Sequence, residues 1–254
     1  YGEHGKIIKT KKITIKEGQF NFPKADEKGV FKLEPKSIDL KLKPGQRKTQ
    51  VIKLNSQIGE NRHIVISGKD IEEDYKYSML DWTKILGENE IELQARRKGR
   101  GMFTFVVPRD AKSGSYHGEI VFKALNTEKD KIIDMKEVPV NIIVGEDYQP
   151  EVSIRSLHTV KEENGYLLSL DLKNTGNIQL IPKAKLTISN SKGEFIENLH
   201  LKLPESVEKI IPLKSKQLTG TLHKLTKGRY KVKIKILDNN NEVINSFNKD
   251  LEIK

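Results

Sequence analysis

The fold is decided by the stretch Val107-Pro108-Arg109-Asp110-Ala111-Lys112-Ser113-Gly114-Ser115-Tyr116-His117-Gly118-Glu119-Ile120-Val121-Phe122. An apolar run from Met102 to Val107 precedes it, and Tyr116, Ile120 and Phe122 then share one face of an alternating segment. Alternation of this kind is typical of strands that bury one face and expose the other. The stretch therefore predicts a strand, a loop with a tight turn, and a second strand.

A second corner of the same kind lies near the C-terminus, in Leu225-Thr226-Lys227-Gly228-Arg229-Tyr230-Lys231-Val232-Lys233-Ile234-Lys235-Ile236. In both corners a tyrosine, Tyr116 or Tyr230, follows a glycine by two positions and opens an alternating strand. In β-sandwiches a tyrosine at such a place donates a hydrogen bond to the backbone upstream. The repeated corner predicts two similar β-domains, with both tyrosines in structural positions.

Turn-forming residues recur roughly every 10 to 15 residues, a spacing typical of an all-β sandwich. We therefore predict an all-β fold of two tandem immunoglobulin-like β-sandwich domains, residues 1–147 and 148–254. The candidate linker is Gly145-Glu146-Asp147-Tyr148-Gln149-Pro150. No helix longer than two turns is predicted, and the segment from Asp70 to Trp82 is either an irregular loop or one short helix.

Other segments refine this prediction. Lys43-Pro44-Gly45-Gln46 has the residues of a type II turn, which leads either into a hairpin or into a strand that crosses between sheets. One or two short strands are predicted within residues 6–16, and another at Glu208–Leu213. Asp238-Asn239-Asn240-Asn241-Glu242 predicts a hairpin turn, with a weak cation site as the alternative.

The chain of 254 residues carries a formal net charge of +11, and the excess of lysine and arginine is spread over both halves. A nucleic-acid module usually concentrates this charge and places aromatic residues between the cations, so we predict no nucleic-acid partner. The remaining interpretations are a solvated lysine-rich surface and attraction to an anionic surface such as a cell-wall polymer.

No residue pattern indicates catalysis. The chain has no cysteine, which excludes disulfides, thiol nucleophiles and cysteine-bound metals. We find no nucleophile elbow, phosphate loop or dinucleotide fingerprint. No two histidines have metal-ligand spacing, and His117 is expected to be exposed beside its corner. We therefore predict a protein that is not an enzyme and that has no cofactor and no metal site.

Two features are candidate binding residues. Arg96, Arg97, Lys98 and Arg100 place four cations in five positions on a predicted hairpin tip, where they could bind an anionic polymer or an acidic partner. The alternative is a solvated turn. Trp82, the only tryptophan, is either a buried plug or an exposed contact for a partner.

Several motifs resemble those of a known family. Leu42-Lys43-Pro44-Gly45-Gln46, Trp82 and the segment Phe103–Gly118 resemble immunoglobulin-like domains of bacterial surface proteins, above all the WxL-interacting proteins of Gram-positive bacteria. Leu170–Asn177 and Leu225–Val232 resemble the second domain of that family. The resemblance implies a first domain that binds peptidoglycan, a second that binds host or partner proteins, and a C-terminal membrane anchor.

Together these observations predict a non-enzymatic extracellular cell-surface protein that binds anionic cell-wall polymer or partner surface proteins of bacteria. Strand edges and loop tips would make the contacts. The alternative is a pilus or matrix assembly chaperone, or a structural subunit, that acts by β-strand exchange. A signal peptide or a membrane anchor is expected to lie outside these 254 residues.

Overall fold

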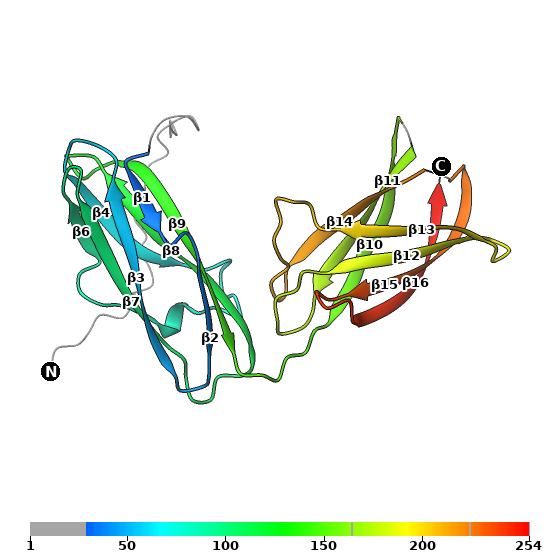
Figure 1. Ribbon diagram of the computed structural model, residues 1–254, viewed down its shortest axis with the longest axis horizontal. Coiled ribbons are helices and arrows are strands. Elements are labelled where there is room, and N and C mark those ends of the chain that lie inside the picture. The colour runs from blue at the N-terminus through cyan, green and yellow to red at the C-terminus, as the bar shows by residue number, and fades with distance from the viewer. Residues whose placement is uncertain (1–28, 164, 224, 254) are drawn as a thin grey trace. The chain divides into compact units, whose positions relative to one another are not determined.

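The computed structural model describes residues 29–163, 165–223 and 225–253, whose regular secondary structure is β-strand apart from one short 3₁₀ turn (Figure 1). Contacts divide the chain into two compact units, unit 1 ending at Glu146 and unit 2 beginning at Asp147. The all-β prediction is confirmed, and each unit is an immunoglobulin-like β-sandwich. The strands predicted within residues 6–16 lie outside the described residues.

Unit 1 consists of two packed sheets, with strand orders β1-β3-β7-β5 and β2-β9-β8-β4-β6. All pairs are antiparallel except β2 with β9, which run parallel. The strands are β1 (Phe31–Glu34), β2 (Ile38–Leu42), β3 (Arg47–Ser56), β4 (Arg62–Lys69), β5 (Thr83–Ile85), β6 (Glu90–Leu93), β7 (Lys98–Val106), β8 (Gly114–Leu125) and β9 (Ile132–Val144).

The core of unit 1 lies between these sheets, and the alternation along β7 and β8 builds it. Phe103 and Phe105 on β7 are fully buried, and so is Phe122 on β8. The Phe103 and Phe122 rings meet edge to face at 6.1 Å between centroids. Each such side chain removed from water contributes about 1.5–3 kcal/mol, so the period-two pattern is what joins the two sheets.

The predicted turn at Lys43–Gln46 is confirmed. Gln46 N donates to Lys43 O at 3.0 Å, and Gly45 has a φ of +79°, which favours glycine. Because β2 and β3 belong to different sheets, the connection is a crossing between sheets and not a hairpin. Gly45 N also donates to Val107 O at 3.1 Å, which ties this turn to the start of the first corner.

Unit 2 has one continuous strand order, β10-β11-β14-β13-β12-β15-β16, folded over its own core. The link between β14 and β13 is a single pair, Thr219 with Lys202. The strands are β10 (Val152–Glu162), β11 (Gly165–Asn174), β12 (Lys183–Asn190), β13 (Phe195–Lys202), β14 (Ser215–Leu222), β15 (Gly228–Leu237) and β16 (Val243–Ile253).

The strand predicted at Glu208–Leu213 is wrong, because the strand that follows β13 in the chain, β14, begins only at Ser215. The predicted segment instead makes one isolated bridge, Ile210 with Leu180, and Leu213 has a φ of +66°. The buried Asn174 side chain explains this, since its Nδ2 donates to Ile210 O at 3.0 Å. The Asn174 amide thus donates the hydrogen bond to this carbonyl that the backbone of a neighbouring strand would otherwise donate.

The expectation that His117 is exposed is also wrong. The segment Asp70–Trp82 is an irregular loop that ends in a short 3₁₀ turn, η1 (Leu80–Trp82), and part of it runs along β8. His117 N donates to Tyr77 O at 2.8 Å, and Met79 N donates to His117 O at 3.2 Å. The side chain is 4% exposed and its Nε2 lies 3.0 Å from Ser115 Oγ, so the loop covers the histidine.

The two tyrosine corners are confirmed. The Tyr116 hydroxyl donates to Lys112 O at 2.9 Å, and the Tyr230 hydroxyl donates to Thr226 O at 2.8 Å. In both cases the acceptor lies four residues upstream, and both rings are largely buried. The hydroxyl therefore fixes the loop before each strand to the strand itself.

We expect Tyr116→Phe to lower the free energy of unfolding of unit 1 by about 1–2 kcal/mol, because the partly buried hydrogen bond to the Lys112 carbonyl is lost. Trp82, the only tryptophan, lies in unit 1, so its fluorescence during urea unfolding follows that unit. Tyr230→Phe is the matched control and should leave the fluorescence midpoint unchanged. Equal midpoint shifts in both variants would contradict this role.

Candidate strand-binding site

The predicted cation cluster, Arg96 to Arg100, lies partly in a turn and partly on a strand. The segment from Gln94 to Arg97 is a turn that leads from β6 in one sheet to β7 in the other, so it is not a hairpin tip. Arg96 and Arg97 lie in this turn, whereas Lys98 and Arg100 lie on the outer face of β7. All four side chains are exposed. Their binding role stays a prediction.

Trp82 packs within a group of aromatic rings on the loop over β8. Its ring lies 4.2 Å from that of Tyr116, and Tyr77 contacts Tyr116 edge to face at 5.7 Å. Tyr75 continues the row, 6.3 Å from Tyr77. Burial, followed by the neighbouring Tyr77, raises the pKa of Tyr116. Burial is also the main cause that raises the pKa of Tyr75, with Glu72 and Tyr77 adding to it. The half-buried Trp82 is thus part of the packing of this loop.

The described ranges contain no cluster of metal ligands and no long apolar helix. Groups of three or more histidine or acidic residues that could hold a metal ion do not occur in residues 29–163, 165–223 and 225–253. Within the same ranges, none of the helical structure is long and apolar enough to cross a membrane. The features that remain for a binding role are sheet edges and sheet faces.

The edges of unit 2 form the best-defined candidate. β10 and β16 are the first and last strands in its order, so each leaves one side of its backbone without a neighbouring strand in the described part of the chain. Asn245 Nδ2 donates to Val152 O at 3.3 Å, which places the starts of the two edges side by side. Unpaired edges of this kind can receive an extended segment from another chain.

Farther along, the two edges border a groove of about 450 Å³. Its apolar part comes from Leu157 on β10, Tyr166 on β11 and Leu251 on β16. Lys161 and His158 contribute from one side, and Asp250 and Glu252 from the other. The groove therefore combines unpaired backbone edges, an apolar floor and charges of both signs. These are the elements that hold an added β-strand, because the edges provide affinity and the alternate side chains provide selectivity.

Unit 1 has a second free edge, on β9. This strand is 13 residues long, but β2 pairs only with Val140–Val144. The rest of that edge, Ile132–Pro139, has no neighbouring strand among residues 29–146. Asp134 there accepts a hydrogen bond from Val30 N at 2.8 Å, and Lys136 Nζ lies 3.6 Å from Asp134 Oδ1. Charges directed along an edge typically protect it from pairing.

Sequence reasoning missed the groove. Its residues are ordinary in type, and they are far apart in the chain, near residue 160 and near residue 251. They come together because the sheet of unit 2 folds over its core, which brings its first strand, β10, next to its last strand, β16. No local pattern carries that order.

No family model matches the chain, and no curated protein matches it by sequence. By structure it is similar to the class 5 fimbriae chaperone CfaA, at 15% identity and a TM-score of 0.46, over 88% of this chain and 100% of that chain. It is also similar to the E. coli chaperone DraB, at 9% identity and a TM-score of 0.43, over 87% of this chain and 96% of that one. A third is the Pseudomonas aeruginosa chaperone CupB2, at 7% identity and a TM-score of 0.41, over 85% and 98%.

At these values the likeness concerns the fold alone. The family expected from the sequence is nevertheless corrected, because these three similar structures are chaperones and not WxL-interacting surface proteins. The shared motifs explain the error, since a Pro-Gly turn followed by a strand and a Gly-x-Tyr corner belong to sandwich architecture in general. The resemblance to that family implied peptidoglycan binding and a membrane anchor, and we withdraw both expectations.

The tyrosine row predicts a loss of stability in alkali. An unfolded tyrosine releases its proton near pH 10, whereas the raised pKa of Tyr75 keeps its proton in the folded state. The stability from this group is therefore complete below about pH 10 and is lost as the pH rises further. Tyr75→Phe should reduce the fall in the free energy of unfolding between about pH 9 and about pH 11.

Urea unfolding followed by Trp82 fluorescence measures this fall at each pH. Tyr230→Phe, in the other unit, serves as the control and should show the same fall as the unsubstituted protein. A steeper alkaline loss in Tyr75→Phe would show that the sign of the effect is wrong.

Proposed function

We propose that this protein is a non-enzymatic assembly protein that binds a surface-protein subunit by β-strand addition, as a chaperone or as a structural subunit. The observation that carries the proposal is the groove between β10 and β16, where two sheet edges without neighbouring strands in the described residues border an apolar floor. The ligand would be an extended segment of the partner. We place this activity outside the cytoplasm, in keeping with a chain that has no cysteine.

The geometry of the groove suggests how the segment would lie. β10 and β16 run in the same direction, since Val152 meets Asn245 at their starts and both strands lead into the groove. An inserted strand could thus be antiparallel to both edges at once, and antiparallel pairing is slightly more stable per residue than parallel pairing. Alternate side chains of the segment would face Leu157 and Leu251 and should be apolar.

The intervening side chains of the segment would meet the charged rim. Lys161 lies on the β10 side, and Asp250 and Glu252 lie on the β16 side. A segment with an acidic residue toward β10 and a basic residue toward β16 would therefore be favoured. This gives a sequence pattern for the partner, with alternating apolar residues separated by polar residues of opposite charge.

Selection from a random decapeptide library displayed on phage tests the proposal. Enriched peptides should show the alternating pattern. When bound, they should protect backbone amides of β10 and β16 from hydrogen exchange. Enrichment of no peptide, or protection confined to β9, would contradict this function.

The chain has no cysteine, so single-cysteine labelling can block the groove selectively. Thr159→Cys places a thiol in the groove lining, and we expect the unmodified variant to bind the selected peptide. Reaction with a bulky maleimide should then weaken binding by at least tenfold, because the label occupies the space of the strand. Lys216→Cys on β14, outside the groove lining, is the labelled control and should bind normally.

A further inference from the structure

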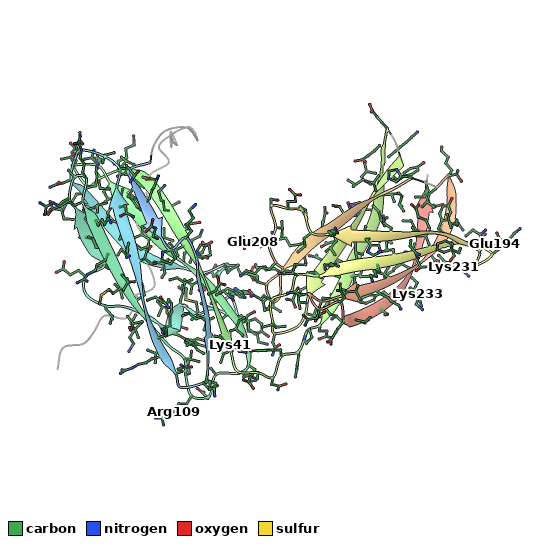
Figure 2. All side chains as sticks on the ribbon, in the orientation of Figure 1. Lys41, Arg109, Glu194, Glu208, Lys231 and Lys233 are labelled. Atoms are coloured by element: carbon green, nitrogen blue, oxygen red, sulfur yellow. The ribbon has the colours of Figure 1, made fainter. Side chains whose placement is uncertain are left out.

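The outer face of three adjacent strands in unit 2, β13, β12 and β15, carries six exposed lysines. On β12 and β15 the lysines alternate with buried residues of the core, which fixes their direction toward solvent. We call this surface the lysine face, and its lysines are Lys183, Lys185, Lys202, Lys231, Lys233 and Lys235. Figure 2 labels Lys231 and Lys233 along β15.

The strand register brings these cations together. Lys185 lies directly opposite Lys235, and Lys183 lies directly opposite Lys202. At the start of β15, Arg229 shares this face and lies 3.5 Å from Glu252 on β16, and further outward residues of the three strands are neutral side chains such as His200, Thr187 and Asn198. Neighbouring strands are about 4.8 Å apart, and like charges directly opposite one another destabilise a sheet. The face therefore holds a charge arrangement that opposes folding.

A lysine on a sheet face can have acidic partners, as one lysine of unit 1 shows. Lys69 on β4 makes ion pairs with Glu119 at 2.9 Å and Glu137 at 2.7 Å on the outer face of its sheet. None of the six lysines of the lysine face makes an ion pair within the part of the chain that the structure describes. Acidic residues occur only at its border, where Asp250 on β16 lies opposite Lys231.

Protection of an edge does not explain this face. Lysines often keep exposed edge strands from pairing with other chains. However, β12 lies between β13 and β15, and β15 lies between β12 and β16, so both are interior strands with two neighbours. Their backbones are already paired, and the lysines have no edge to guard.

We propose that the lysine face binds a linear polymer of repeating phosphate groups. Lysines two apart on one strand are separated by about 6.6 Å, and those on neighbouring strands by about 4.8 Å, so a flexible chain of anions can contact several at once. Lysine binds phosphate as a compact point charge, and the one arginine at the margin of the face, Arg229, already lies beside Glu252. The bound phosphates would neutralise the opposed lysines and so reduce the electrostatic repulsion between them.

The composition of the face favours a polymer over a folded protein or a nucleic acid. Protein interfaces have an apolar core and are depleted in lysine, whereas the outward residues here are lysine and small polar residues. Single-stranded nucleic acids bind to grooves with aromatic side chains on which the bases stack. Phe195, 62% exposed at the start of β13 opposite Ser189, is an aromatic side chain near this face, and it lies at the margin.

Binding of long-chain inorganic polyphosphate to the full chain tests the inference. The triple variant Lys185→Gln, Lys233→Gln, Lys235→Gln should raise the Kd at least tenfold at about 50 mM salt and should flatten the dependence of log Kd on log salt between about 50 and about 200 mM. Its melting temperature should be equal or higher, because opposed like charges are removed.

The matched control, Lys173→Gln, Lys216→Gln, Lys227→Gln, removes the same charge from β11, β14 and the loop before β15. It should change the Kd by less than threefold. An equal loss in both variants, or no binding of polyphosphate by the unsubstituted protein at about 50 mM salt, would overturn the proposal. Tighter binding of oligothymidylate or of polyglutamate than of polyphosphate would also overturn it. Thr159→Cys with its groove label should still bind polyphosphate, which separates this inference from the proposed strand-binding function.

Discussion

The strands of this protein satisfy their backbone hydrogen bonds in neighbouring strands, and most of them bury only one of their two faces. A sheet that does not close completely leaves two strands whose outer backbone groups have no neighbour. In unit 2 these are β10 and β16, and they diverge from a shared start at Val152 and Asn245. The groove beyond that start is a direct consequence of the strand order, and no specialised loop is needed to form it.

The same constraint accounts for what the sequence could predict. Corners and turns depend on a few neighbouring residues, so the hydroxyls of Tyr116 and Tyr230 and the glycine of the Lys43–Gln46 turn are visible in the chain itself. The alternation that buries Phe103 and Phe122 is equally local. For this reason the all-β class and the sandwich architecture follow from the sequence.

The features that sequence reasoning missed depend on contacts between distant segments. Asn174 takes the carbonyl of Ile210, 36 residues away, and thereby removes a predicted strand. The loop before η1 covers His117, which a corner position alone would leave exposed. The cations Lys98 and Arg100 belong to a sheet face because β7 begins at Lys98, four positions before the apolar run that starts at Met102. The groove is the extreme case, since it exists only through the strand order.

The two proposed sites of unit 2, the groove and the lysine face, meet at β16. The surface charge changes from positive to negative at this strand. Asp250 and Glu252 lie opposite Lys231 and Arg229, so the positive charge of the lysine face ends at this strand. The same two carboxylates line the groove. A polyanion on the lysine face would therefore be repelled from the groove, while a strand added beside β16 would be favoured by basic residues near them. An added strand would also extend the sheet of β13, β12, β15 and β16. Its outward side chains would lie beyond the acidic residues of β16 and would not reach the lysine face. Two ligands of different chemistry could thus occupy one small unit without competing for the same surface.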